Sequence, residues 1–296
     1  MAGIALASTI TAMTMFGSVL AYARFFHKET RESFTTEELE RYSIWTNWWD
    51  YFKLGVPSAF IYWIEMVSIQ GLQVLAVLFG SVAQQNFGFI YSILYVVVQF
   101  GYGSQQAMTI IVGNLIGANQ VALAKKMAIY ALLQLVVIGG MISFALFIYR
   151  DEILRIFSEG YDIDVSIARE CMLLVALINL IIAYFSYLIG CCRALGIQAV
   201  GVPIAMFFSL AEIPMGMLFS WHYNMRVWGL IFTYALSFSL QSLILTAILT
   251  IWTDWQSIAD KVQVYIRSEV GRGNTSSTKG SNNTSGSREN RNEDDG

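Results

Sequence analysis

The sequence predicts an all-α membrane protein with about seven transmembrane helices. Of its 296 residues, 56% are hydrophobic and 13% are charged, whereas a soluble chain carries about a quarter charged residues. A helix needs roughly 20 mostly apolar residues to cross the hydrocarbon core, and the chain has seven such runs. The runs are continuously apolar, which argues against barrel strands because those alternate apolar and polar residues.

The first apolar run has no preceding Lys or Arg and no clear small-residue cleavage site leading into a soluble domain. We therefore interpret it as a retained span and not as a signal peptide. The predicted spans cover residues 3–22, 57–79, 88–115, 127–149, 171–188, 200–220 and 227–252.

The positive charges predict the orientation in the membrane. With seven spans, the loops on one side, together with the C-terminal tail, carry fourteen Lys and Arg residues, against four on the other side. Because positive residues concentrate in cytoplasmic loops, we expect a cytoplasmic C-terminus and an N-terminus outside the cell or in a lumen. Residues 252–270 alternate apolar and charged positions at helical spacing after two tryptophans, which predicts a helix lying on the cytoplasmic membrane surface.

Two carboxylates interrupt the apolar runs. An ionisable residue inside a span is costly and normally faces a cavity or a partner, so it marks a functional site. Glu65 follows Pro57 by eight residues and is the stronger candidate for exchanging a proton for a cation. Glu212 precedes Pro214 by two residues, and we expect it close enough to the membrane boundary to meet water. The neighbours expected to share the site of Glu65 are Tyr62, Trp63, Gln70 and Gln73.

The third span carries too many polar residues for a helix surrounded by lipid. At least one of its faces should line a wet cavity or pack on other protein. Its polar residues include Gln99, Tyr102, Ser104, Gln105, Gln106, Thr109 and Asn114.

The chemistry of enzymes and metal sites has no signature in the sequence. Cys171, Cys191 and Cys192 lack the spacing of a zinc ribbon. We find no nucleophile elbow, phosphate loop or HExxH sequence. We therefore expect no enzyme activity, no cofactor, no bound metal and no nucleic-acid partner, but a lipid bilayer and a small-molecule substrate.

Several segments resemble the multidrug and toxic compound extrusion (MATE) family. VGNLIGANQVALAKK (residues 112–126) is similar to the end of its eighth helix, and Glu65 falls where eukaryotic members have a seventh-helix glutamate. Further similar segments, in the same order, are CCRALGIQAVG (191–201), IPMG (213–216) and the last span with Gln241. The resemblance covers residue 3 to about residue 255 and implies the sixth to twelfth helices of a twelve-helix transporter.

The resemblance also implies a domain organisation. Residues 1–26 would be the last helix of an N-terminal lobe, 27–54 a cytoplasmic linker between lobes, and 55–252 a six-helix C-terminal lobe. Residues 253–267 would form the interfacial helix. Residues 268–296, rich in Gly, Ser, Asn and charged residues, would form a disordered cytoplasmic tail.

The implied function is secondary active antiport. Such a transporter exports organic cations or other amphiphiles in exchange for H⁺ or Na⁺ by rocking two lobes about a central cavity. Glu65 would bind the coupling cation, whereas Gln70 replaces a second glutamate of many members and Glu212 replaces a small residue. The matched motif positions with a structural role would be Gly113, Asn114, Gly117 and Arg193.

Other possibilities remain open at this stage. The resemblance leaves out the first five helices of the transporter, and this missing N-terminal lobe could be a preceding segment or a second copy of the chain. The membrane could be the plasma membrane or that of a vacuole-like organelle. A seven-helix receptor and a regulatory lobe that does not transport are the alternative functions.

Overall fold

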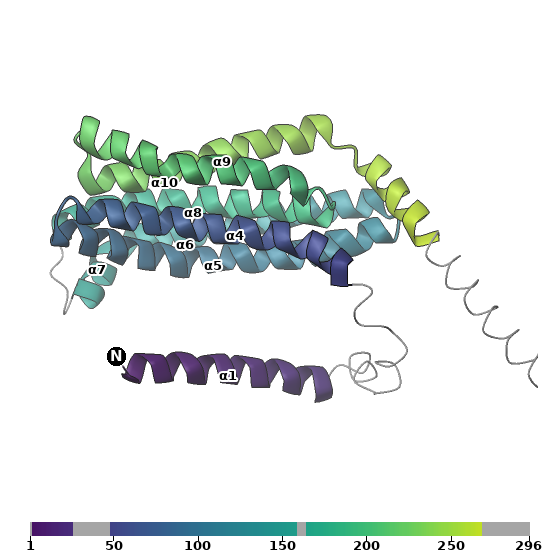
Figure 1. Cartoon of the computed structure of the whole chain (residues 1–296), viewed down its shortest axis with the longest axis horizontal. Helices are drawn as coiled ribbons and strands as arrows, with labels where there is room; N and C mark the ends of the chain where they lie inside the picture. The colour runs from purple at the N-terminus through teal and green to yellow at the C-terminus, as the bar shows by residue number, and fades with distance from the viewer. Residues whose placement is uncertain (1, 26–47, 159–163, 268–296) are drawn as a thin grey trace, which may run out of the picture. The chain divides into compact units, whose positions relative to one another are not determined.

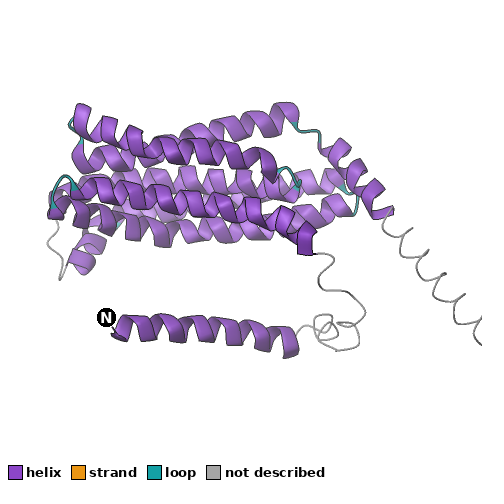
Figure 2. Cartoon of the chain, viewed as in Figure 1, coloured by secondary structure: helices purple, strands orange, loops and turns teal. Residues whose placement is uncertain are grey.

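The computed structural model describes residues 2–25, 48–158 and 164–267, and these residues divide between two compact units, 1–56 and 57–296. All elements within the described ranges are helical, which confirms the predicted fold class (Figure 2). The predicted linker is described only from residue 48 onward, and the predicted disordered tail lies outside the described residues.

The first unit contains helix α1 (Ala2–Phe25), which is apolar on every face. Its polar side chains bond within the helix: the hydroxyls of Thr9, Thr11 and Thr14 donate to the carbonyl oxygens four residues earlier at 2.8–2.9 Å. Because lipid offers no hydrogen-bond partners, this internal pairing suits a membrane span. Helix α4 (Trp48–Val77) begins in this unit, and from Pro57 onward it belongs to the second unit.

The second unit is a bundle of long helices that lie side by side along one axis (Figure 1). Short connections make successive long helices run in opposite directions. After α4 come α5 (Ser81–Gly117), α6 (Val121–Ile148), the short α7 (Arg150–Ser158), α8 (Val165–Ala194), α9 (Gln198–Met217) with the π-helical turn η1 (Leu218–His222), and α10 (Arg226–Ala247) with the π-helical turn η2 (Ile248–Trp252). A final helix covers residues 255–267, close to the predicted interfacial segment.

Helix α8 forms the centre of the bundle and packs on α5, α6 and α10. Its buried Asn179 is satisfied across the interface with α6, where its Nδ2 donates to the Gly139 carbonyl at 3.2 Å and to Ser143 Oγ at 3.0 Å. A buried polar group without a partner costs free energy, so this pairing fixes how α6 sits against α8. On the other side, Gly190 lets α8 approach α5 closely, since a Cβ there would lie 3.2 Å from the Gln105 carbonyl oxygen.

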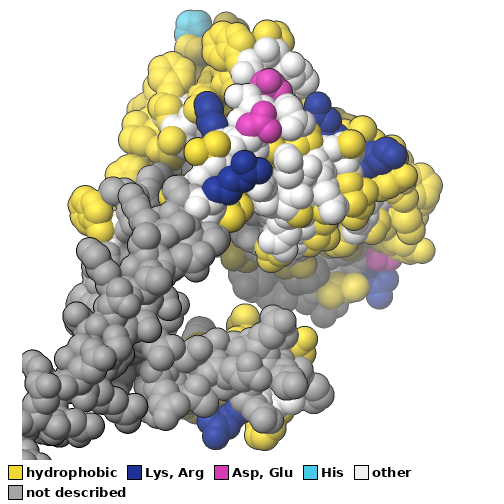
Figure 3. All heavy atoms as spheres, turned by 90° about the vertical axis from the view of Figure 1, so that its right-hand side faces the viewer, with side chains coloured by type: hydrophobic (Ala, Val, Ile, Leu, Met, Phe, Trp, Pro, Cys, Tyr) yellow, Lys and Arg dark blue, Asp and Glu magenta, His cyan; other side chains and the backbone are white. Residues whose placement is uncertain are grey.

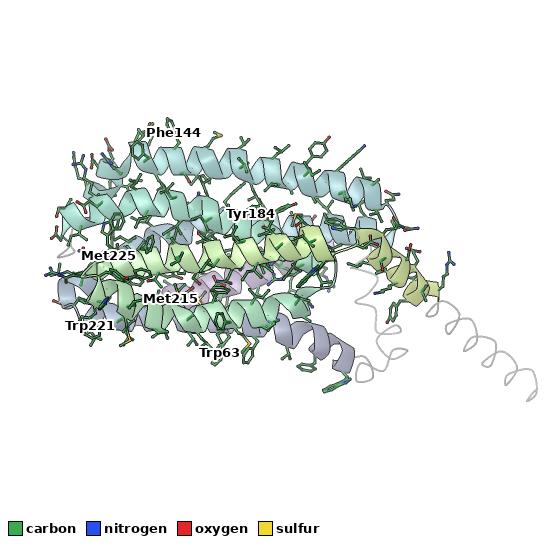
Figure 4. The ribbon with its side chains drawn as sticks, turned by 90° about the horizontal axis from the view of Figure 1, so that it is seen from above. Trp63, Phe144, Tyr184, Met215, Trp221 and Met225 are labelled. Atoms are coloured by element: carbon green, nitrogen blue, oxygen red, sulfur yellow. The ribbon has the colours of Figure 1, made fainter. Side chains whose placement is uncertain are left out.

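The outer surface of the bundle is apolar. Large hydrophobic side chains project outward, as Phe144 and Trp221 do in Figure 4, with exposed fractions of 65% and 55%. An exposed apolar surface of this extent is typical of a protein that contacts lipid. Among the residues that the structure describes, six helices are long and apolar enough to cross a membrane. The second predicted span corresponds to α4, in which the apolar stretch Trp63–Val77 is shorter than those of the other six.

Candidate functional site

The structure places the Glu65 carboxylate against α5. Glu65 Oε1 accepts a hydrogen bond of 3.0 Å from the Tyr102 hydroxyl. The side chain is only half-buried. Glu65 therefore faces the interior of the bundle with one direct donor from the neighbouring helix.

A small cavity of about 70 Å³ adjoins this pair. Most of its wall comes from one face of α5, and three of its lining residues are tyrosines of that helix. The cavity is lined by Glu65, Met66, Tyr91, Leu94, Tyr95, Val98, Gln99, Tyr102 and Tyr234. Because a water needs only about 10–15 Å³ of such space, the cavity has room for water or a small cation beside the carboxylate.

Glu212 occupies a second, tighter environment. Its carboxylate accepts a hydrogen bond from the Ser68 hydroxyl of α4, and the Ser237 hydroxyl of α10 lies beside it. Gln241 Nε2 in turn donates to Ser237 Oγ at 3.1 Å. Glu212 is 2% exposed, so three helices enclose it.

This burial corrects the expectation that Glu212 meets water at the membrane boundary. The prolines of α9 do not end the helix, which continues to Met217 with Pro203 and Pro214 inside it. Prolines are tolerated within membrane helices because neighbouring groups can satisfy the freed carbonyls. Glu212 therefore lies within the packed helix and is more completely buried than Glu65.

The two carboxylates belong to one connected region. Ser68 follows Glu65 by three residues on α4, so both lie on the same face of that helix. The charges of Glu65 and Glu212 also interact electrostatically. The Tyr234 side chain of α10 interacts electrostatically with both carboxylates.

The other residues predicted to accompany Glu65 do not gather around it. Trp63 is 60% exposed, lies at the outer edge of the bundle in Figure 4 and contacts the Phe60 ring at 5.4 Å. Gln70 is exposed on α4. The Tyr62 side chain lies outside the described part of the structure.

The residues predicted as structural lie at the end of α5 and α8. A Cβ on Gly113 would lie 3.7 Å from the Ala194 carbonyl oxygen, so the glycine allows these two helix ends to pack closely. The Asn114 carbonyl accepts from the Ala118 N–H at 2.9 Å, while its side chain is exposed. The Gly117 carbonyl accepts from Gln263 Nε2 at 2.6 Å, which ties helix 255–267 to the α5–α6 turn. Arg193 lies half-buried in the last turn of α8.

The polar third predicted span, now α5, divides its polar groups between two surroundings. Gln99 and Tyr102 line the cavity beside Glu65, and Gln105 is buried against α8. The expectation that this helix meets a cavity or other protein is confirmed. The residues that sequence reasoning missed as site members are Ser68, Tyr91, Tyr234 and Ser237. The spacing of Tyr91, Tyr95 and Tyr102 along one helical face was the available signal.

Comparison with known proteins identifies relatives of this chain. The MatE family model matches residues 54–218, more than half of the chain. Multidrug and toxin extrusion protein 2 of Homo sapiens is 23% identical over 220 residues, which cover 74% of this chain and 35% of that protein. The protein of the same name from Oryctolagus cuniculus is 22% identical over 245 residues, 80% of this chain and 38% of that protein. The chain thus spans little more than a third of these relatives.

Solved structures agree with the fold. The eukaryotic MATE transporter AtDTX14 superposes with a TM-score of 0.71 at 21% identity, covering 84% of this chain and 55% of that one. The Vibrio cholerae MATE transporter VcmN in its bent form gives a TM-score of 0.62 at 18% identity, covering 71% and 50%. Together with the apolar helices, these matches show that the chain is a multi-pass integral membrane protein that belongs to the MatE family.

Proposed function

We propose that this chain is the C-terminal part of a secondary active antiporter that exports organic cations or other amphiphilic small molecules in exchange for H⁺ or Na⁺. Membership of the MatE family supports transport, and the curated relatives are named for multidrug and toxin extrusion. The same membership favours a transporter over a seven-helix receptor.

The observation that carries this proposal is the Glu65 carboxylate, bonded to Tyr102 beside a tyrosine-lined cavity. A carboxylate at membrane depth is expensive and is a functional group by default. Its oxygens suit a proton, a sodium ion or the positive end of an organic cation. Tyrosine faces add attraction for cations. Competition between the coupling ion and the substrate for one carboxylate is a simple physical basis for exchange.

The proposed orientation puts the C-terminus in the cytoplasm. Figure 3 shows the end of the bundle that carries helix 255–267, where Lys and Arg side chains stand out among polar and apolar ones. The described basic residues near this end are Lys125, Lys126, Arg193, Lys261 and Arg267. Over the whole sequence, fourteen Lys and Arg residues are assigned to this side and four to the other, which fits the rule that positive loops stay inside. The membrane is proposed to be the plasma membrane or that of a vacuole-like organelle.

Transport by alternating access needs a partner for this bundle. The six long helices α4, α5, α6, α8, α9 and α10 correspond to one lobe, and access alternates when one bundle rocks against another around a fixed site. We propose that the second lobe comes either from a preceding segment or from a second copy of the chain. We propose that transport uses no cofactor other than the coupling ion.

The test is transport into proteoliposomes that hold the chain together with its second lobe. Uptake of ethidium, a fluorescent organic cation, is measured under an imposed pH gradient, an imposed Na⁺ gradient or neither. Glu65→Gln keeps the shape of the side chain but removes its charge, and we expect it to abolish gradient-driven uptake. Glu152→Gln, at an exposed acid of α7, is the matched control and should transport normally.

The outcome also separates the alternatives. Uptake that follows the pH gradient identifies H⁺ as the coupling ion, and uptake that follows the Na⁺ gradient identifies Na⁺. Unchanged uptake with an unchanged ion dependence in Glu65→Gln would remove Glu65 from the mechanism. Absence of uptake by the wild-type assembly in every arm would favour the regulatory lobe over the transporter.

A further inference from the structure

We propose that Glu212, with the hydroxyls of Ser68 and Ser237, forms a second binding site for a monovalent cation, a proton or a sodium ion, apart from the cavity beside Glu65. The site joins residues of α4, α9 and α10. It rests on the proposed function only in assigning the bound cation to the exchange cycle.

The buried charge of Glu212 favours a bound cation. Glu212 is 2% exposed, and its interacting neighbours are Ser68, Ser237 and Glu65. No Lys, Arg or His of the described ranges lies within ion-pair distance of its carboxylate. A buried carboxylate without a positive partner is strongly unfavourable. A proton or a sodium ion bound at the carboxylate itself would compensate this charge.

The hydroxyl partners of Glu212 have the chemistry that a cation site needs. A serine hydroxyl can donate to an ionised carboxylate or accept from a protonated one, because its hydrogen rotates. Serine and carboxylate oxygens are also ligands that suit hard cations. The Ser237 hydroxyl is itself oriented by Gln241 Nε2 at 3.1 Å. The environment of Glu212 can therefore serve both the empty and the occupied carboxylate.

Other titratable groups face this site. From α4 comes Glu65, from α10 comes Tyr234, and the tyrosines of α5, Tyr91 and Tyr102, interact with Tyr234. Glu65 and Glu212 repel each other when both are ionised. Release of a cation from one carboxylate therefore makes the other carboxylate hold its own cation more tightly. The two sites would therefore exchange their cations in an ordered way.

The Glu212 site is also linked to the helix that carries Glu65. The Ser68 hydroxyl that bonds Glu212 lies one turn from Glu65 on the same helix. A shift of α4 against α9 during transport would lengthen this contact. Cation occupancy at Glu212 would thereby bias the position of the helix that carries Glu65.

Infrared difference spectroscopy of the purified full chain in lipid tests the proposal without substrate. Spectra are recorded across a pH titration in Na⁺-free buffer, and on replacing K⁺ by Na⁺ at fixed pH. We expect a carboxyl component that disappears in Glu212→Gln but persists in Glu65→Gln and in the exposed control Glu152→Gln. A response of that component to pH identifies the proton, and a response to Na⁺ identifies sodium.

A Glu212 component that responds to neither change, or a spectrum of Glu212→Gln identical to wild type, would overturn the proposal. If Glu212→Gln does not fold, Ser68→Ala replaces it, and a shifted component is expected because one hydroxyl partner is lost. The readout does not depend on transport. Unchanged uptake by Glu65→Gln would therefore contradict the proposed function but would not affect the infrared test of the Glu212 site.

Discussion

Glu65 and Glu212 lie on helices of the same bundle, but their surroundings differ. Glu65 is half-buried and has one hydroxyl donor from Tyr102 beside a cavity of about 70 Å³. Glu212 is 2% exposed, is bonded to Ser68, and lies beside Ser237 in a packed interface between three helices. An acid beside a cavity can exchange its partners quickly, whereas an enclosed acid needs its neighbours to move.

The difference teaches that the acid singled out most strongly by the sequence need not be the more deeply buried one. Both acids interrupt apolar runs, and the one next to a proline in mid-span is the more buried. What decides is which helices cover each position. The packed region around Glu212 and the region beside the Glu65 cavity should therefore respond differently to substitution.

The largest expected effect is on packing around the Glu212 region. A Cβ on Gly216 would lie 2.8 Å from Leu72 Cδ2 and 3.4 Å from Leu230 Cδ2. Gly216→Leu should therefore lower the free energy of unfolding by about 3 kcal/mol, at the upper end of the usual cost of overpacking. Gly103 of α5 has no atom within 4 Å of such a Cβ, so Gly103→Leu serves as the control. Thermal unfolding in detergent, followed by circular dichroism, compares the two, and equal losses would contradict the contrast.

Removing the serine hydroxyl that bonds the buried carboxylate should have the next largest effect on stability. Ser68→Ala leaves Glu212 without its donor from α4, and a buried group that loses its partner costs about 1–3 kcal/mol. Ser92 is a suitable control because its exposed hydroxyl bonds the Gly88 carbonyl of its own helix. Chemical denaturation of both variants gives the comparison. A loss for Ser92→Ala as large as that for Ser68→Ala would show that burial is not the cause.

The matching deletion at the open site should cost less stability. Tyr102→Phe removes the donor to Glu65, but water in the adjoining cavity can take its place, so we expect a loss below about 1 kcal/mol. Ethidium exchange should change more than stability does, since the donor acts directly on the coupling carboxylate. Tyr95→Phe, in the same cavity wall, should leave exchange near wild type. An exchange rate in Tyr102→Phe equal to that of Tyr95→Phe would argue against the role of the Tyr102 hydroxyl.

An exposed acid outside the spans provides the reference for both. Asp164 caps α8, and hydrogen bonds from the Ser166 side chain, from the Ile167 backbone and from the Ser166 backbone lower the pKa of its carboxyl. A carboxyl whose pKa is lower in the folded state than in the unfolded state stabilises the fold at pH values above its unfolded pKa. This stabilisation is lost as the pH falls through the folded-state pKa. Asp164→Ala should thus reduce thermal stability at neutral pH, and the difference from wild type should shrink on acidification. A difference that grows toward low pH would contradict the assigned hydrogen bonds.

The helices could be predicted from the sequence because long apolar runs leave a membrane chain few alternatives. The same reasoning singled out Glu65, since a charge within such a run stands out. The expectation that Glu212 meets water was wrong because Ser68 of α4 and Ser237 of α10, on helices distant in sequence, cover its carboxylate.

The partners of the two acids could not be predicted. The bonds from Tyr102 to Glu65 and from Ser68 to Glu212 cross between helices that are distant in sequence. Which faces meet depends on the rotation and tilt of each helix, and an apolar run with little periodicity does not reveal them. Trp63 and Gln70 share a helix with Glu65 but project elsewhere for the same reason.

The measurement that tests the contrast most directly is the rate at which a hydrophobic carbodiimide modifies each carboxyl in the same lipid-reconstituted protein. Peptide mass spectrometry at successive times would follow Glu65 and Glu212 separately, with the exposed Glu152 as the reference. We predict that Glu65 reacts much faster than Glu212, because a cavity adjoins the former and packed helices enclose the latter. Equal rates, or faster modification of Glu212, would contradict the division into an open and an enclosed carboxylate.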